Sequence, residues 1–179
     1  MNDPYLGQNT DVVLGQEFLT WLWFRSETRP ASFSDKEGQP YGVAMEQRVV
    51  VQGGEGESLE TASVSGPLSQ LLEARLGLRT GKKVTRALIR FEQDSLTWQV
   101  SMKAEDFALG SLRTPKVEQE GDEDPDALFL EKMYLTERCL GLFDAAFKLF
   151  LSTRLSGEWE EEAHAMSVWM TTDPDENPA

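Results

Sequence analysis

The side chains best placed to act together are six bases between Arg75 and Arg90, a segment without a single acid. The whole chain has 31 acids against 17 bases and a formal net charge of −14, so this segment is an unusual concentration of positive charge. A row of bases can bind a phosphate backbone, because each neutralised phosphate releases counterions. The candidate nucleic-acid-binding residues are Lys82, Lys83, Arg86 and Arg90.

A second interpretation of these bases is a solvated sheet face whose charges pair with the abundant acids elsewhere. In an extended strand, Lys82, Arg86 and Arg90 share one face and lie about 13 Å apart in turn, at 3.3 Å per residue. The spacing fits both interpretations, and the sequence leaves them open.

The sequence contains few residues that could bind a transition metal or act as an activated nucleophile. A zinc site needs three or four Cys, His or carboxylate ligands, whereas the chain has one cysteine, Cys139, and one histidine, His164. No Ser or Cys stands in a recognisable motif beside His164, as a nucleophile activated by a base would require. We therefore expect no catalytic residue, no metal and no cofactor, with Cys139 an inert core thiol. A carboxylate pair assembled only by the fold stays open.

Two further motifs have structural interpretations. Residues 118–126, EQEGDEDPD, resemble a calcium loop, but Pro125 occupies the position where that loop needs a glycine. The segment is therefore expected to be a solvated loop. Gly53, Gly54 and Gly56 precede a predicted strand rather than a helix, which favours a hairpin turn over a phosphate-binding loop.

Hydrophobic periodicity predicts an α+β fold. Apolar residues four apart indicate a helix over residues 14–27. Alternating patterns over 41–52 and 59–64 predict one hairpin, and those over 82–91 and 96–102 predict a second. We expect an antiparallel sheet of about four strands, with a short helix between the hairpins.

A long helix is predicted from Asp124, its N-cap, to about Leu155, a length of roughly 45 Å at 1.5 Å per residue. A stripe as broad as its two apolar rows should be buried against the sheet and the N-terminal helix. One row is Leu128, Leu135, Leu142 and Leu149, and the other is Phe129, Met133, Leu140, Phe143, Phe147 and Phe150.

The length of 179 residues fits one domain, which we place at residues 1–170, with a disordered acidic tail over 171–179. The N-terminus lacks the pattern of a signal peptide, and the most apolar segment, Phe18–Phe24, is far shorter than the roughly 20 residues of a membrane span. A single cysteine permits no internal disulfide. These features predict a cytoplasmic protein without a membrane partner.

Four stretches resemble the C-terminal portion of recombination-associated RdgC proteins: EFLTWLWFRSE (17–27), GKKVTRALIRF (81–91), LRTPKV (112–117) and DPDALFLEKMYLTE (124–137). The likeness covers most of residues 14–155. It implies a bacterial cytoplasmic or nucleoid-associated protein that forms a ring-shaped dimer, binds duplex DNA with little sequence preference and restrains a recombinase. The resemblance implies a longer chain, so we expect much of the family's N-terminal portion to be missing from this sequence, and the net charge departs from that of a typical DNA binder.

The expected function is therefore that of a non-enzymatic, RdgC-like DNA-associated protein that binds duplex DNA weakly and is linked to recombination. One alternative is an acidic protein–protein interaction module without DNA binding. A second is a metal-dependent nuclease. We also expect a homodimer or a partner protein, held by apolar surface on the helix over 125–155 or on the helix that contains Trp21 and Trp23.

Overall fold

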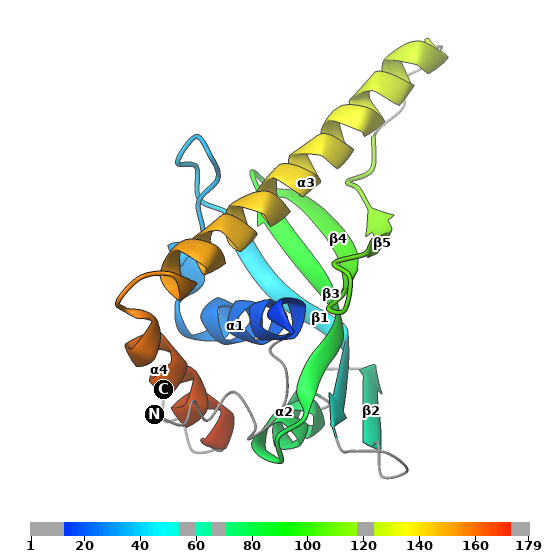
Figure 1. The fold of residues 1–179 in the computed structure, drawn as a ribbon. Helices are drawn as coiled ribbons and strands as arrows, with labels where there is room; N and C mark the ends of the chain where they lie inside the picture. Colours follow the sequence, from blue (N-terminus) through cyan, green and yellow to red (C-terminus); the bar gives the residue numbers. More distant parts are fainter. Residues whose placement is uncertain (1–12, 54–59, 66–70, 118–123, 173–179) are drawn as a thin grey trace.

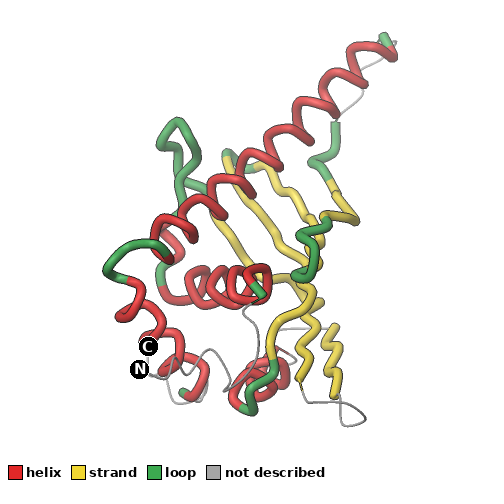
Figure 2. The backbone as a smooth tube through the Cα atoms, in the orientation of Figure 1, coloured by secondary structure: helices red, strands yellow, loops and turns green. Residues whose placement is uncertain are grey.

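The computed structural model describes residues 13–53, 60–65, 71–117 and 124–172. The described strands form one antiparallel sheet in the order β2-β1-β3-β4-β5. The helices lie on one side of this sheet (Figures 1 and 2). The elements are α1 (Leu14–Thr28), a 3-10 turn (Pro30–Ser32), β1 (Gly42–Gly53), β2 (Glu60–Ser65), α2 (Leu71–Arg79), β3 (Lys83–Gln93), β4 (Leu96–Lys103), β5 (Leu109–Arg113), α3 (Pro125–Arg154) and α4 (Trp159–Thr171).

The predicted α+β class, the two hairpins and the long helix are confirmed. The strand β5 was not predicted, because its five residues contain Gly110 and a Ser111 at φ 49°, and so lack an alternating pattern. The tail predicted for 171–179 lies outside the described residues from position 173 onward. Most of the acidic segment, residues 118–123, lies outside them too.

The inner face of the sheet is the apolar face that alternation predicts. Val43 and Met45 of β1 are buried, as are Ile89 of β3 and Val100 of β4. These side chains alternate with exposed or half-buried neighbours, so every second residue points to the helices. The other buried residues of this face are Val51, Val84, Ala87, Phe91, Trp98 and Met102.

The helix α1 is buried on nearly all sides. The side chains of Trp21 and Trp23 are 0% and 1% exposed. The helix lies against β1 and β3 on one side and against α3 and α4 on the others. Trp21 and Trp23 therefore offer no apolar surface for self-association, and the expectation that placed such a surface there is wrong. The reason is that two further helices cover the side that faces away from the sheet.

Buried polar contacts hold α1 to α4. The carboxylate of Glu162 accepts hydrogen bonds from Trp21 Nε1 at 3.0 Å, Arg25 Nη1 at 2.6 Å and Arg29 Nη1 at 2.9 Å. Glu162 itself is only 4% exposed. Since three donors converge on one buried carboxylate, this charge is fully compensated.

The helix α3 begins as predicted, with the side chain of Asp124 accepting a hydrogen bond from the backbone N–H of Asp126 at 3.1 Å. Its C-terminal half packs on α1, where the ring centroids of Phe147 and Phe18 are 5.2 Å apart. Its N-terminal half projects beyond the sheet (Figure 1). The predicted burial is therefore wrong here for Phe129 and Met133 of the second row, because the helix is longer than the sheet beneath it, whereas Leu135 of the first row is buried as predicted.

We expect Gly15→Ala to destabilise the protein by at least about 2 kcal/mol, since overpacking a close contact forces the backbone to shift. A Cβ on Gly15 would lie 2.0 Å from the carbonyl oxygen of Ala104, where α1 touches the end of β4. The matched control is Gly141→Ala in α3, where a Cβ meets nothing within 4 Å. That control should gain about 0.4–1 kcal/mol from helix propensity. Urea unfolding followed by circular dichroism measures both, and equal stability of the two variants would contradict the contact.

We expect Cys139 to be unreactive toward thiol reagents in the native protein at pH 8 and reactive in urea. Its side chain is fully buried, and burial raises the pKa of the thiol from 9.0 to about 11. Because the unfolded thiol ionises first, the stability contributed by this shift is present below pH 9 and is lost as the pH rises toward 11. The stability difference between wild type and Cys139→Ala should therefore shrink over that interval. Rapid native labelling would contradict this placement.

Candidate nucleic-acid interface

Three of the four predicted DNA-binding bases, Lys83, Arg86 and Arg90, lie on the uncovered face of the sheet. Arg86 and Arg90 alternate along β3 with the buried Ala87, Ile89 and Phe91, so their side chains point away from the helices. Their separation along the strand is about 13 Å at 3.3 Å per residue. We call the side of the sheet opposite the helices the open face.

Lys82 does not join this row, and Lys83 does. Lys82 precedes β3 and donates its backbone N–H to the Gly77 carbonyl at 3.1 Å, so it belongs to the turn after α2. The pairing of β1 with β3 shifts register between Val50 and Val51, which changes the alternation along β3. Lys83 lies next to the buried Val84 and is therefore on the open face. The predicted row of Lys82, Arg86 and Arg90 is wrong at Lys82, because a β-bulge reverses the alternation there.

Two further bases of the open face were not predicted. Lys103 of β4 lies directly across from Arg86 in the sheet register. Arg113 of β5 lies across from Gln99, which in turn lies across from Arg90. Strands are about 4.8 Å apart, so these bases extend the row of Arg86 and Arg90 sideways by roughly 5 to 10 Å. The sequence patterns alone do not show which residues of different strands are neighbours.

The electrostatic environment separates these bases into two kinds. Arg90 is neutralised locally, since its Nε lies 3.1 Å from Glu46 Oε1 and 3.4 Å from Glu92 Oε1. Arg86 and Lys103 are like charges on directly opposed positions, an arrangement that destabilises a sheet. Among the described residues, neither forms an ion pair with a carboxylate. An external anion would relieve this repulsion.

The rest of the open face is mixed, with neutral polar residues, the acids Glu46 and Glu92, and the aliphatic side chains of Val50 and Leu88. Gln99 and Ser101 stand between the bases and can donate hydrogen bonds. No aromatic side chain is found among the described residues of this face, so it offers bases of a nucleic acid no stacking platform. The described side chains are Ala44, Glu46, Val50, Lys83, Arg86, Leu88, Arg90, Glu92, Thr97, Gln99, Ser101, Lys103 and Arg113.

A hollow of about 490 Å³ lies beside the β3–β4 turn, lined by Pro40, Tyr41, Gly42 and residues 92–97. The buried Gln93 donates its amide to Asp35 Oδ2 at 2.9 Å, and this bond is the main reason that the pKa of Asp35 lies below its ordinary value. Burial raises the pKa of Tyr41, whose hydroxyl donates to the Leu142 carbonyl at 3.0 Å.

The polar groups around this hollow satisfy one another. Arg138 donates to Gln93 Oε1 at 2.9 Å and to Asp94 Oδ2 at 2.6 Å. No nucleophile stands beside a base among these contacts, so the hollow lacks the arrangement that covalent catalysis requires.

The residues considered for metal or catalytic chemistry remain apart. His164 is exposed on α4, whereas Cys139 is buried on α3. Within the part of the chain that the structure describes, no three His, Cys, Asp or Glu side chains are grouped so that they could hold a metal ion. None of the described helices is both long enough and apolar enough to cross a membrane.

The open face is thus the feature of this fold that combines accessible positive charge with hydrogen-bond donors. Comparison with known proteins adds no relative: no protein-family model, no curated protein and no solved structure matches the chain.

Proposed function

We propose that the protein binds duplex DNA through the phosphate backbone, without sequence preference, by laying the open face of its sheet against the duplex. The observation that carries this proposal is the directly opposed pair of Arg86 and Lys103, which has no described carboxylate partner in a protein of net charge −14. Arg90, Arg113 and Lys83 surround the pair on the same face.

Phosphate is the anion that suits this surface. Duplex DNA carries one negative charge per roughly 1.7 Å of its axis, so a patch about 13 Å long meets several phosphates. Arginine and lysine supply the charge, while Gln99 and Ser101 supply neutral donors between them. The acids of the chain lower the affinity at long range, which favours weak and strongly salt-dependent binding.

The shape of the face argues against sequence readout. Five strands at about 4.8 Å spacing are roughly 19 Å across, wider than the major groove of about 12 Å. The sheet therefore lies across the backbone rather than in a groove. Contacts to phosphate carry no direct sequence information.

The proposed link to recombination rests on the RdgC-like stretches described above. Two of these stretches supply bases to the open face: residues 81–91 contribute Lys83, Arg86 and Arg90, and residues 112–117 contribute Arg113. The family likeness and the charged surface thus concern the same segments of the chain.

We expect the double variant Arg86→Glu with Lys103→Glu to bind a fluorescent duplex of random sequence at least tenfold more weakly than wild type at about 50 mM salt, because both phosphate contacts become repulsive. The slope of log affinity against log salt should fall by about 2 × 0.9, one contact's share for each lost base. Fluorescence anisotropy measures both quantities.

The matched control is Lys36→Glu with Lys148→Glu, which changes the net charge equally at two exposed positions away from the open face. Its affinity should change far less. Two unrelated duplexes of equal length should bind wild type with similar affinities. The proposal is wrong if wild type fails to bind at tens of micromolar protein in about 50 mM salt, or if the control weakens binding as much as the test variant does.

We expect no hydrolysis of DNA in the presence of Mg²⁺ or Mn²⁺, since the described residues offer neither a metal-ligand cluster nor a nucleophile–base pair. Linear and circular duplexes are incubated with highly purified protein and examined on a gel. Metal-dependent loss of DNA that persists in the variant Arg86→Glu with Lys103→Glu would indicate a contaminant. Loss that disappears in that variant would establish the nuclease alternative.

A further inference from the structure

The projecting half of α3 exposes large apolar side chains that the chain itself does not cover. Phe129 and Leu130 are 63% and 65% exposed, and Met133 and Tyr134 are 52% and 59% exposed. Leu140 follows at 46%. At roughly 200 Å² for each fully exposed side chain, the five expose about 600 Å². This equals the largest apolar patch of a typical monomer, a size that marks interaction surfaces.

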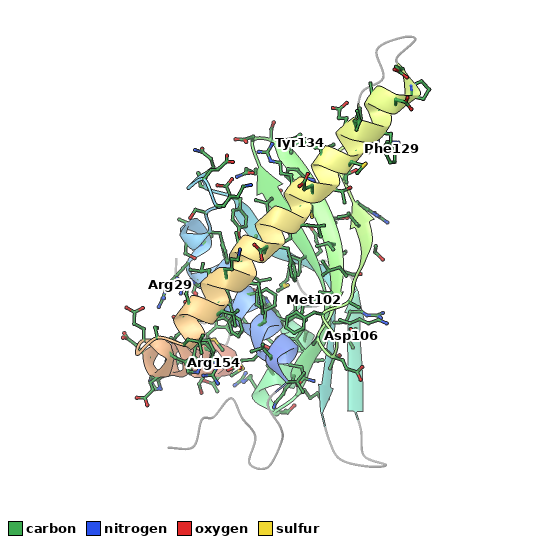
Figure 3. The ribbon with its side chains drawn as sticks, turned by 45° about the horizontal axis from the view of Figure 1, so that its top comes forward. Arg29, Met102, Asp106, Phe129, Tyr134 and Arg154 are labelled. Carbon is green, nitrogen blue, oxygen red and sulfur yellow. The ribbon has the colours of Figure 1, made fainter. Side chains whose placement is uncertain are left out.

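These side chains form one broad face. Phe129 and Tyr134 lie on its two margins (Figure 3). At about 100° of rotation per residue, Leu130 and Met133 fall between them, at the centre of the face. This face points away from the buried side of the helix, which carries Leu135, Cys139 and Leu142 of the core. The first turns of α3 thus expose apolar side chains on a side that no other described element covers.

A glycine lies at the C-terminal end of the same face. Gly141 is exposed in the interior of α3, seven residues after Tyr134, and a Cβ there would meet nothing within 4 Å. Glycine costs a helix interior about 0.5–1 kcal/mol relative to alanine. The packing of this chain gives no reason for it. A glycine at such a position lets the backbone of a second helix approach closely.

The charges around the face indicate what would bind. Asp124, Asp126, Glu131 and Glu137 are all exposed on this half of the helix. Of the two cations there, Arg138 is already bound to Asp94 at 2.6 Å, which leaves Lys132. At the same rotation per residue, Asp126 and Glu137 lie in line with the face, one turn before and one turn after the cluster of Phe129, Leu130, Met133 and Tyr134, and Glu131 lies beside it. These carboxylates bound the cluster and form its acidic rim.

We propose that the projecting half of α3 is the docking surface for a basic amphipathic helix of a partner protein. Apolar anchors of that helix would cover Leu130, Met133 and the flanking rings, as the side chains of two packed helices interdigitate. Its lysines or arginines would meet the acidic rim. A second copy of this chain suits the surface less well, because a two-fold contact between α3 helices would oppose the same carboxylates.

This surface is separate from the proposed DNA interface. The projecting half of α3 is on the helix side of the molecule, whereas Arg86 and Lys103 are on the opposite side of the sheet. A partner helix and a duplex could therefore be bound at the same time. Failure of one proposal leaves the other standing.

The test uses the full chain and a synthetic peptide of about 18 residues, built from leucine at i, i+3, i+4 and i+7 and lysine elsewhere. A second peptide has glutamate in place of lysine. We expect the lysine peptide to bind with micromolar affinity and the glutamate peptide not to bind at about 100 µM. Fluorescence anisotropy of labelled peptide measures both.

Variants then separate the apolar face from general attraction to an acidic protein. Leu130→Ser with Met133→Ser leaves the net charge unchanged and should weaken binding of the lysine peptide at least tenfold. The matched control is Leu155→Ser with Val168→Ser, which removes apolar side chains that are 83% and 50% exposed outside the face. It should leave the affinity within about twofold. Gly141→Leu should weaken binding without lowering the stability of the protein.

Three results would overturn the proposal. The first is no binding of the lysine peptide at about 100 µM. The second is an equal loss of affinity in the test and control variants, which would show that the peptide binds by charge alone. The third is a dimer in sedimentation equilibrium that Leu130→Ser with Met133→Ser dissociates, because the occupant is then a second copy of the chain.

Discussion

The buried carboxylate of Glu162 holds two helices of this protein, α1 and α4, together. It lies on α4 and accepts hydrogen bonds from Trp21 and from two arginines near the end of α1. Removing one partner of such a cluster would leave a charge uncompensated in the interior, which is far costlier than the net value of the pair itself. With α1 held in this way between the sheet and α4, the apolar face of the sheet is filled from one side. The opposite face is left open to solvent.

Much of the fold follows from local patterns in the sequence, and the errors have identifiable physical causes. The strand β4 was predicted because its alternation from Leu96 to Met102 is uninterrupted. The strand β5 was missed because a glycine and a residue at positive φ remove the alternation. The contact of Gly15 with Ala104 could not be predicted either, since it depends on how two distant elements meet. Local spacing determines which face of an element is apolar, but not how far the neighbouring element extends.

Three of the five bases of the candidate interface were among the predicted residues, namely Lys83, Arg86 and Arg90. Arg86 and Arg90 share a face because both lie on one regular stretch of strand, which sequence spacing can show. The position of Lys103 could have been predicted from the sequence. The two-residue turn Asp94–Ser95, with both φ angles positive, sets the register that places Lys103 opposite Arg86. The position of Arg113 could not have been predicted, because β5 lacks the alternation of apolar and polar residues that marks a strand. Distant pairings such as that of Trp21 with residue 162 leave no trace in the spacing of a single sequence.

The position of α1 has a consequence for the synthesis of the protein. Its Phe18, Trp21 and Trp23 pack against Phe150 and Trp169, which are made more than a hundred residues later. At about 5–20 residues per second, the intervening chain takes roughly 7 to 30 s to emerge. During that interval α1 can pack on β1 and β3 but lacks the cover that α3 and α4 give its other side, and a chaperone that binds exposed apolar helices would meet it there. The order of translation therefore leaves the centre of the core to be assembled last.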